Sequence, residues 1–262
     1  MLKQVRHAKN NMLISIITAV LNSANTIEDC IKSVQSQTYK NIEHIIIDGG
    51  STDGTLDIIK RYADTGKIKW VSKQDNGMYD AINKGIRIAT GEVIGILNSD
   101  DFYAHEKVVE LVMNAFENPD IDACYGDLLY VDKDNTEKIV RYWKSKPYKD
   151  GLFRYGWHPP HPTFFVKKWV YEKYGFFRTD MKIGSDYELM LRFIEGCKIR
   201  THYISEVLVK MRMGGKSNRS LRNILLQTFE DYKAWKINGL SCGITGVFFK
   251  KMNKISQFYH RP

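Results

Sequence analysis

The sequence predicts an α/β fold in which helices flank a mostly parallel sheet. Apolar runs of four to six residues, each ending in a turn, alternate with helical patterns over residues 12–97. Such runs are typical of strands buried on both faces, and strands that alternate with helices pair in parallel. Five carboxylates follow or interrupt these runs, at Asp48, Asp53, Asp75, Asp100 and Asp101. Because ligands bind at the carboxyl ends of strands in open α/β sheets, we expect these acids to converge on one site.

The first half of the chain follows a regular alternation. Strands are expected at 12–20, 42–47, 68–72 and 93–97. Helices are expected between them, at about 25–37, 54–63 and 78–89. Asn25 and Glu28 have the spacing of a capping box at the first helix. Asp53 fits equally well as a cap of the second helix or as a ligand contact.

The second half is more mixed. A helix at about 105–117 is ended by Asn118-Pro119. Short strands are expected at 121–125, 128–131 and 139–143, and a strand pair near 199–211. Further helices are expected at about 167–174, 186–195, 219–237 and 244–259, the last two amphipathic.

Length and composition indicate a globular protein of one large domain with at most a small appendage. The chain has 262 residues, of which 43% are hydrophobic and 26% charged. No apolar run approaches the roughly 18 residues of a membrane span. The run at 12–21 lacks a following cleavage site, so we expect a strand there and a cytoplasmic protein. The four cysteines lack a C-x-x-C pair and are expected to be reduced core thiols.

The positive charge is concentrated at the end of the chain. Residues 210–262 hold 11 of the 39 Lys and Arg residues but only 2 of the 30 acids, so the whole net charge of +9 lies there. The last predicted helix places apolar residues broadly on one side and Lys250 and Lys254 on the other. This pattern predicts contact with an anionic membrane surface, although a helix packed on its own domain has the same periodicity. Without a recognised binding motif, nucleic acid is not an expected partner.

Three segments carry a family resemblance. They are Thr18-Ala-Val-Leu-Asn22, Asp48-Gly-Gly-Ser-Thr-Asp53-Gly-Thr and Asn98-Ser-Asp100-Asp101. With them the sequence resembles the family 2 glycosyltransferases over residues 12 to about 215. The resemblance implies the GT-A fold and an activated sugar nucleotide as donor.

The first two segments are expected to bind the nucleotide. The resemblance makes Thr18, Asp48 and Asp75 the matching nucleoside contacts. A fixed carboxylate such as Asp48 can accept the N–H of uracil, and Gly49 and Gly50 let a ring approach the backbone; the alternative is that these residues only form a turn. The other predicted donor-binding residues are Val20, Asn22, Gly49, Asn98, Ser99 and Asp100.

The third segment resembles the D-x-D metal signature. Departure of a nucleoside diphosphate builds negative charge, which Mg²⁺ or Mn²⁺ held by one or two carboxylates can neutralise. The chain departs from the signature at its first position, Asn98, whose amide oxygen is a neutral and weaker ligand. We therefore expect Asp100 to bind the metal and Asn98 to touch the sugar, a ribose hydroxyl or a metal-bound water.

A second acid is needed to take the proton from the acceptor hydroxyl. Asp186 matches the family position usually written E-D, with Ser185 in place of the preceding acid, and Glu188 is a weaker substitute. Displacement assisted by a single base implies inversion at the anomeric carbon. Asp186 would also serve as an N-cap of the helix that it opens.

Two loops complete the candidate site. Trp157-His158-Pro-Pro-His161 is a proline-stiffened segment of the kind that sugars pack against, so Trp157, His158, His161 and Asp101 are acceptor-side candidates. His161 fits a structural hydrogen bond as well as a site role. The run Met213-Gly-Gly-Lys216-Ser is not a P-loop, because its spacing and context do not fit; it is either a loop that closes over the diphosphate, with Lys216 or Arg212 nearby, or an exposed turn.

Taken together, these features predict an inverting glycosyltransferase that moves a sugar, from a UDP-sugar, to a hydroxyl of a saccharide or lipid-linked saccharide. Many similar enzymes act in bacterial O-antigen and capsule assembly, and we expect this protein in the cytoplasm, at the inner face of the cell membrane. The expected organisation is a GT-A domain at 1–215, with a nucleotide-sugar half at 12–101 and an acceptor half at 102–215, and a basic helical extension at 216–262. The alternatives are a nucleotidyltransferase, whose glycine-rich triphosphate loop is missing after the first strand, and a non-catalytic membrane-surface module of the same fold.

Overall fold

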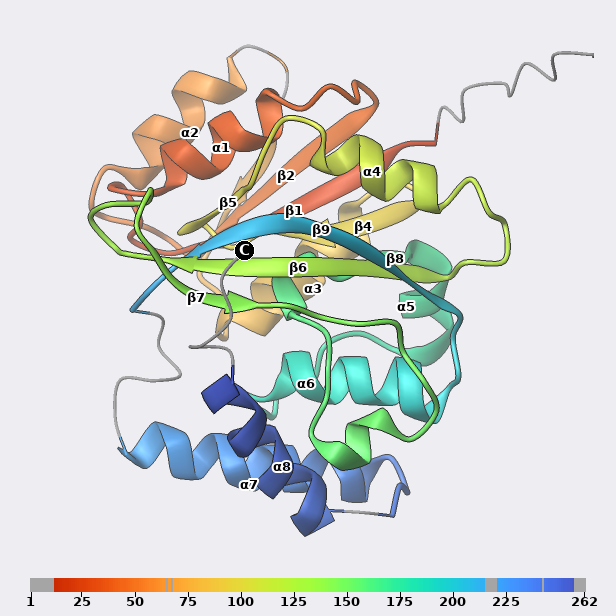
Figure 1. Cartoon of the computed structure of the whole chain (residues 1–262). Coiled ribbons are helices and arrows are strands. Elements are labelled where there is room, and N and C mark those ends of the chain that lie inside the picture. Colours follow the sequence, from red (N-terminus) through yellow and green to blue (C-terminus); the bar gives the residue numbers. More distant parts are fainter. Residues whose placement is uncertain (1–11, 65, 67, 215–220, 242, 257–262) are drawn as a thin grey trace, which may run out of the picture.

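The computed structural model describes residues 12–64, 66, 68–214, 221–241 and 243–256 (Figure 1). Its strands are β1 (Ile14–Val20), β2 (Ile42–Asp48), β3 (Ile68–Ser72), β4 (Val93–Ile96), β5 (Asp101–Tyr103), β6 (Ala123–Val131), β7 (Ile139–Trp143), β8 (Phe165–Lys167) and β9 (Thr201–Arg212). Its α-helices are α1 (Ile27–Gln35), α2 (Thr55–Ala63), α3 (Met78–Ile88), α4 (Val108–Ala115), α5 (Lys168–Tyr174), α6 (Ser185–Met190), α7 (Leu221–Ile237) and α8 (Gly243–Ser256). Shorter turns are the 3-10 helices η1 (Leu152–Tyr155) and η2 (His161–Thr163) and the π-helix η3 (Leu191–Gly196).

The strands form one sheet in the order β3-β2-β1-β4-β8-β6-β9-β5, with β7 paired to β6. The strands β1 to β4 lie parallel to one another. Strand β8 runs antiparallel to β4 and β6, and β6 and β9 are parallel. This topology confirms the prediction of a parallel first half and a mixed second half.

Helices cover both faces of the sheet. In Figure 1, α1, α2 and α4 lie on one face and α3, α5 and α6 on the other, with α7 and α8 beyond α6. Neighbouring residues of a strand point to opposite faces: Ile16 packs in the α1 and α4 cluster, and Ile17 packs in the α3 cluster. Both faces of the sheet are therefore buried, which explains the uninterrupted apolar runs of the sequence. None of the described helices has the length and apolar character needed to cross a membrane.

Strand β6 corrects the prediction of two short strands at 121–125 and 128–131. Gly126 resembles a break in the sequence, yet β6 continues through it. A Cβ at Gly126 would lie 2.5 Å from Leu208 Cγ, so glycine lets β9 pack closely at this point. The pairing of β6 with β9 shifts register here, as expected for an irregularity that glycine permits.

Strand β9 is likewise one strand of 12 residues, where a strand pair was expected. Its far end pairs with β5, which places Asp101 opposite Met211. The strands β5 and β8 have three residues each and were not predicted, because three residues show no periodicity. The pairing of β5 with β9 therefore places residue 101 beside the end of β9, which lies more than a hundred residues later in the sequence.

The first two helices begin one residue later than the capping pattern suggested. Thr26 rather than Asn25 is the N-cap of α1, and no side chain caps that helix. Gly54 is the N-cap residue of α2, but Asp53 Oδ1 accepts hydrogen bonds from Thr55 N and Thr55 Oγ1, at 3.1 and 2.6 Å. Asp53 therefore has a capping role at α2.

The described part of the predicted extension packs against the domain. Ala234 and Trp235 of α7 are buried in the same apolar cluster as Tyr187 of α6. Lys250 of α8 is 5% exposed and forms an ion pair with Asp231 of α7, at 2.8 Å. This burial corrects the expectation that Lys250 lies on the exposed polar side of its helix.

The contact between η1 and α8 predicts a large difference between two glycine substitutions. A Cβ at Gly156, where φ is +75°, would lie 2.1 Å from Lys250 N, whereas at Gly151, where φ is +81°, no atom lies within 4 Å. Both substitutions to alanine strain the backbone, but only Gly156→Ala also forces α8 outward. We expect Gly156→Ala to lower the free energy of unfolding by about 1–3 kcal/mol more than Gly151→Ala, measured by urea unfolding. If both substitutions lowered the free energy of unfolding equally, α8 would be able to move away from residue 156 without loss of stability.

Candidate active site

Asp48 ends β2 and is fully buried. Its carboxylate accepts hydrogen bonds from Gly50 N, Ser51 N, Ser51 Oγ and Ser72 Oγ, at 2.5–3.2 Å. A carboxylate has about four acceptor positions, so these donors occupy its capacity. Asp48 thus holds the turn after β2 against β3, and the predicted contact with uracil would require one of these bonds to open.

Two predicted nucleotide contacts on β1 are corrected by the structure. Thr18 is fully buried, and its Oγ1 lies 3.0 Å from His44 Nε2 of β2. Burial lowers the pKa of His44 to about 4, so this imidazole is neutral at pH 7. The side chain of Val20 lies in the α1 apolar cluster, and only its carbonyl oxygen reaches the loops, accepting from Gly49 N at 2.9 Å. The site therefore begins after β1.

The loop after β1 is tied to the loops after β2 and β4. Asn22, at a left-handed φ of 52°, accepts a hydrogen bond from Thr52 N through its Oδ1 at 2.9 Å. Ala24 N donates to Asp53 Oδ2 at 3.0 Å, and Ser99 Oγ donates to Ser23 Oγ at 3.0 Å. Polar residues of three segments far apart in sequence thus meet at one edge of the sheet, as predicted.

Asp75, after β3, presents an unpaired oxygen. Its Oδ1 pairs with Lys84 of α3, whereas Oδ2 is buried and has no hydrogen-bond partner among the described residues. A Cβ at Gly49 would lie 3.4 Å from this Oδ2, so the glycine keeps the space beside the oxygen clear. A buried acceptor without a donor is costly unless a ligand supplies one. Asp75 Oδ2 and Gly49 together are suited to receive the N–H of a planar base.

The two acids after β4 have different surroundings. Asp100 is half-buried, and no described side chain bonds to its carboxylate; its backbone oxygen accepts from Arg212 Nη1 at 2.8 Å. Asp101 is fully buried, and its Oδ2 accepts from Asn98 Nδ2 at 2.8 Å. Burial and the neighbouring Asp100 raise the pKa of Asp101 well above its usual range. Asp101 Oδ1 is buried and has no hydrogen-bond partner among the described residues, so the acceptor-side role of Asp101 stays a prediction.

The donor set at Asp100 fits a divalent cation that a substrate helps to bind. No group of three His, Cys, Asp or Glu side chains among the described residues could hold a metal ion alone. Mg²⁺ and Mn²⁺ in nucleotide sites are often bound by one carboxylate, water and phosphate oxygens. Asp100 can supply that carboxylate, and Asn98 Oδ1 has no hydrogen bond among the described residues, so it is available for the expected contact with the sugar, a ribose hydroxyl or a metal-bound water.

Asp186 lies in the first turn of α6, opposite His161 of η2. Asp186 Oδ2 is 3.0 Å from His161 Nδ1, and Oδ1 accepts from Tyr187 N at 2.8 Å. The N-cap of α6 is Gly184, without a side-chain cap, so Asp186 is not the cap residue. Its side chain remains 23% exposed. A partly exposed carboxylate oriented by an imidazole has the arrangement of a general base.

The rest of the proline-stiffened loop is less exposed than predicted. Trp157 is 9% exposed and packs edge-on against Phe153 and Tyr125, so it belongs to the core and the expectation of an acceptor platform is corrected. His158 Nδ1 lies 3.0 Å from Pro159 O, and its ring packs against Trp143 and Tyr187. Within this loop, His161 contacts Asp186, the predicted catalytic base.

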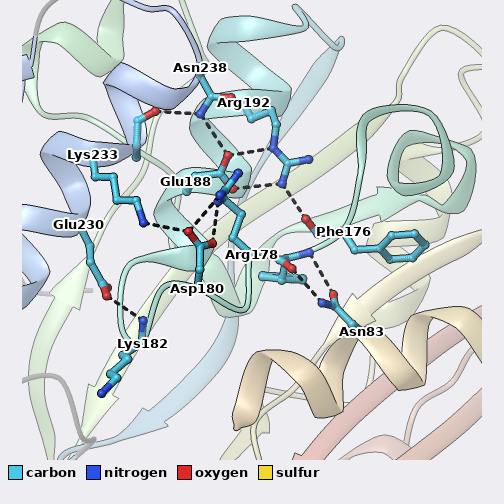
Figure 2. Close-up of polar contacts among 12 residues, drawn as sticks. Asn83, Phe176, Arg178, Asp180, Lys182, Glu188, Arg192, Glu230, Lys233 and Asn238 are labelled. Carbon is cyan, nitrogen blue, oxygen red and sulfur yellow. Dashed lines mark hydrogen bonds and ion pairs between the residues drawn. The ribbon is translucent and has the colours of Figure 1, made fainter. Parts of the chain in front are cut away.

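The charge of Asp186 contributes to the pKa of two tyrosines. The pKa of Tyr130 on β6 is raised by burial and, to a smaller extent, by the charges of Asp101 and Asp186. The pKa of Tyr79 on α3 is raised by burial first and then by Asp186. Glu188, the weaker substitute, is 1% exposed and bound to Arg192 (Figure 2).

Several residues of this region were not predicted from the sequence. Lys84 pairs with Asp80 at i,i+4 spacing, which the sequence could have shown, but its contact with Asp75 joins a loop to a helix and has no local signal. Arg212 was named only as a neighbour of the diphosphate, yet it also pairs with Asp29 of α1. Lys216, and with it the proposed closing loop, lies outside the described residues.

The sequence profile described as "Glycosyl transferase family 2" matches residues 15–178. An uncharacterized glycosyltransferase of Rickettsia typhi is 32% identical over 249 residues, which cover 92% of this chain and 73% of that protein. A "PGL/p-HBAD biosynthesis glycosyltransferase" of Mycobacterium tuberculosis is 27% identical over 210 residues, which cover 79% of each chain.

Solved structures share the fold. Staphylococcus aureus TarS 1-349 in complex with UDP superposes with a TM-score of 0.64 at 15% identity, over 91% of this chain and 68% of that one. The mannosyltransferase PcManGT of Pyrobaculum calidifontis, in complex with GDP-Man and Mn²⁺, gives a TM-score of 0.64 at 17% identity, over 92% and 72%. A longer TarS chain is matched over only 39% of its length. These likenesses confirm the predicted GT-A fold.

Proposed function

This chain belongs to glycosyl transferase family 2, and we propose that it transfers a sugar from a UDP-sugar to a hydroxyl of a saccharide or lipid-linked saccharide, with inversion. The observation that carries the proposal is a set of three acids: Asp75, after β3, with an unpaired oxygen; Asp100, after β4, with a carboxylate that no described side chain binds; and Asp186, in the first turn of α6, paired with His161. The UDP and UDP-GlcNAc complexes of TarS support a uridine donor. Bacterial surface polysaccharide is the proposed product.

In the proposed reaction, the acceptor hydroxyl attacks the anomeric carbon as Asp186 takes its proton. The new bond joins the acceptor oxygen to that carbon, and the bond from the carbon to the diphosphate oxygen breaks, releasing UDP. His161 Nδ1, 3.0 Å from Asp186 Oδ2, orients the carboxylate. Mg²⁺ or Mn²⁺ bound at Asp100 would neutralise the charge that develops on the diphosphate. A single displacement of this kind inverts the configuration of the sugar.

Calorimetric titration of UDP, GDP and dTDP, each with and without Mn²⁺, tests the donor assignment. We expect UDP to bind more tightly than the other two nucleotides, and only with Mn²⁺. The GDP-Man complex of PcManGT makes GDP the relevant competitor. Tighter binding of GDP would mean that the donor is a GDP-sugar, with the same kind of reaction. Absence of binding by all three nucleotides would contradict a sugar transferase.

We also propose that α7 and α8 contact an anionic membrane. Seven of the fourteen large apolar side chains that are exposed among the described residues lie on these two helices, which is a concentration that chance placement does not explain. A groove of about 500 Å³ beside Leu225 and Phe229 is also lined by three cations, Lys182, Arg222 and Lys233, and by two acids, Asp180 and Glu230. Apolar side chains next to cations suit the headgroup region of an anionic leaflet.

Cosedimentation with phosphatidylglycerol vesicles tests this contact. The variant Leu225→Ser/Phe229→Ser should lose most of its vesicle binding, because these side chains are 69% and 63% exposed. A matched control is Ile88→Ser/Ile139→Ser, which removes two exposed apolar side chains elsewhere. Equal binding by both variants would exclude α7 as the contact surface.

A further inference from the structure

The turn at residues 182–184, directly before α6, is held by one carboxylate from α7. Glu230 Oε1 accepts from Lys182 N at 2.8 Å, and Glu230 Oε2 accepts from Ile183 N and Gly184 N at 2.9 and 2.7 Å. Glu230 is 4% exposed, so these three bonds are shielded from water. Bonds from backbone N–H groups to a carboxylate are charge-assisted and strong. Figure 2 shows Glu230 reaching from its helix to this turn.

The same turn is held from the donor side by α3. Tyr79 Oη donates to Ile183 O at 2.8 Å, and its ring stacks on Phe177 with centroids 5.7 Å apart. Tyr79 is the second residue of α3, which follows the loop that carries Asp75. The turn therefore has its N–H groups bound by the C-terminal extension and a carbonyl bound by the nucleotide half.

Gly184 allows this close approach. It is the N-cap of α6 and has no side chain of its own, and Glu230 binds its N–H together with the N–H groups of the two residues before it. A Cβ at Gly184 would lie 3.0 Å from Glu230 Cβ, which is tighter than ordinary contact. Asp186 follows two residues later, so the position of this turn sets where α6 begins and where the Asp186 carboxylate points.

Other contacts between α6 and the extension lie after Asp186. Trp235 Nε1 donates to Tyr187 Oη at 3.1 Å, and Lys250 Nζ lies 3.7 Å from the centroid of the Tyr187 ring. Asn238 Nδ2 donates to Glu188 Oε1 at 3.1 Å (Figure 2). These contacts anchor the body of α6, whereas the Glu230 contacts anchor the turn that precedes it.

We propose that Glu230 is a positioning residue for sugar transfer, which holds the 182–184 turn so that Asp186 faces the acceptor hydroxyl. This proposal rests on the proposed function, in which Asp186 is the base. Glu230 acts through the backbone and touches neither substrate nor metal. Displacement of a catalytic group by about 1 Å can lower a rate by about 100-fold, so a small movement of this turn would have a large effect.

The variant Glu230→Gln tests the proposal with little change in volume. One oxygen becomes an NH₂ group that cannot accept from the turn, so at least one of the three bonds is lost. We expect kcat to fall by about 10- to 100-fold, measured as UDP release from the UDP-sugar that the full chain uses fastest. Calorimetric binding of UDP should change by less than about 2-fold, because the donor loops keep their contacts. The control Asn238→Ala, which removes an anchor after Asp186, should leave kcat within about 3-fold.

A double variant separates positioning from general damage. If Glu230 acts through Asp186, adding Glu230→Gln to Asp186→Asn should lower the residual rate by less than about 2-fold, because residues that act as a unit are not additive. The proposal would be overturned if the double variant lost as much activity as the product of the two single losses. It would also be overturned if UDP binding by Glu230→Gln fell by the same factor as kcat. Full activity of Asp186→Asn would instead contradict the base assignment and leave the effect of Glu230 measurable by itself.

Two further measurements test the same contacts, one in a second variant and one by a readout other than activity. Tyr79→Phe removes the bond to Ile183 O and keeps the stacked ring, so it should lower kcat in the same manner by a smaller factor. Amide hydrogen exchange of residues 182–184 should become faster in Glu230→Gln, because these N–H groups lose their acceptor. Unchanged exchange together with unchanged kcat in Tyr79→Phe would also overturn the proposal.

Discussion

Replacing Asp186 with asparagine is expected to lower kcat by about 10²- to 10⁴-fold, the usual contribution of a general base. Asparagine keeps the shape and can still accept from Tyr187 N, so α6 should keep its position. The amide cannot take a proton from the acceptor hydroxyl. UDP release from the donor measures the rate, and calorimetric UDP binding should remain within about 2-fold.

The matched variant is Glu188→Gln in the same helix. Glu188 is almost fully buried and bonded to Arg192 and Asn238, so its substitution should reduce stability without removing the base. His161→Gln should give a smaller loss than Asp186→Asn, because it removes the partner that orients the carboxylate but leaves the carboxylate in place. If Glu188→Gln abolished turnover while Asp186→Asn retained it, Glu188 would be the general base and Asp186 would have a structural role.

Replacing Asp100 with alanine is expected to abolish the Mn²⁺-dependent part of UDP binding. Its carboxylate is the one in the third segment that remains accessible, and without it a cation at the diphosphate keeps only neutral protein ligands. Because a divalent cation contributes several kcal/mol when it neutralises developing charge, kcat should fall by at least about 100-fold. Calorimetry with and without Mn²⁺ measures the first effect, and UDP release measures the second.

The neighbouring acid provides the control for Asp100. Asp101 is buried on β5 and bound to Asn98, so Asp101→Asn should retain Mn²⁺-dependent binding and most of the activity. Similar losses in the two variants would indicate that both acids bind the cation. Unchanged binding in Asp100→Ala would exclude the predicted metal site.

The nucleotide half could be predicted from the sequence because its signals are local. Runs such as Ile42–Ile47 are long enough to indicate buried strands, and turns rich in Gly and Asp mark the carboxyl ends where the site lies. The type of residue at the site was predictable, but its surroundings were not. Thr18 and Asp101 have suitable chemistry, yet both are fully buried, and Asp101 Oδ2 is bound to Asn98.

The acceptor half was harder to predict, because its arrangement depends on contacts between segments that are distant in the sequence. The pairing of His161 with Asp186, and that of Glu230 with the 182–184 turn, leave no periodic signal in the chain. The strands β5 and β8 are too short for a pattern, and Gly126 resembles a break although it lies inside β6. These features arise from tertiary packing, which overrides local propensity.

The path of the chain also determines when the site can be assembled during synthesis. The Asp100 loop is fixed by Arg212, 112 residues later, and the turn before Asp186 is fixed by Glu230. At the usual 5–20 residues per second, a ribosome needs roughly 10 s to proceed from the first of these segments to the last. A nascent chain can therefore pair β1 to β4 early, yet it stays without a completed site until α7 has been made.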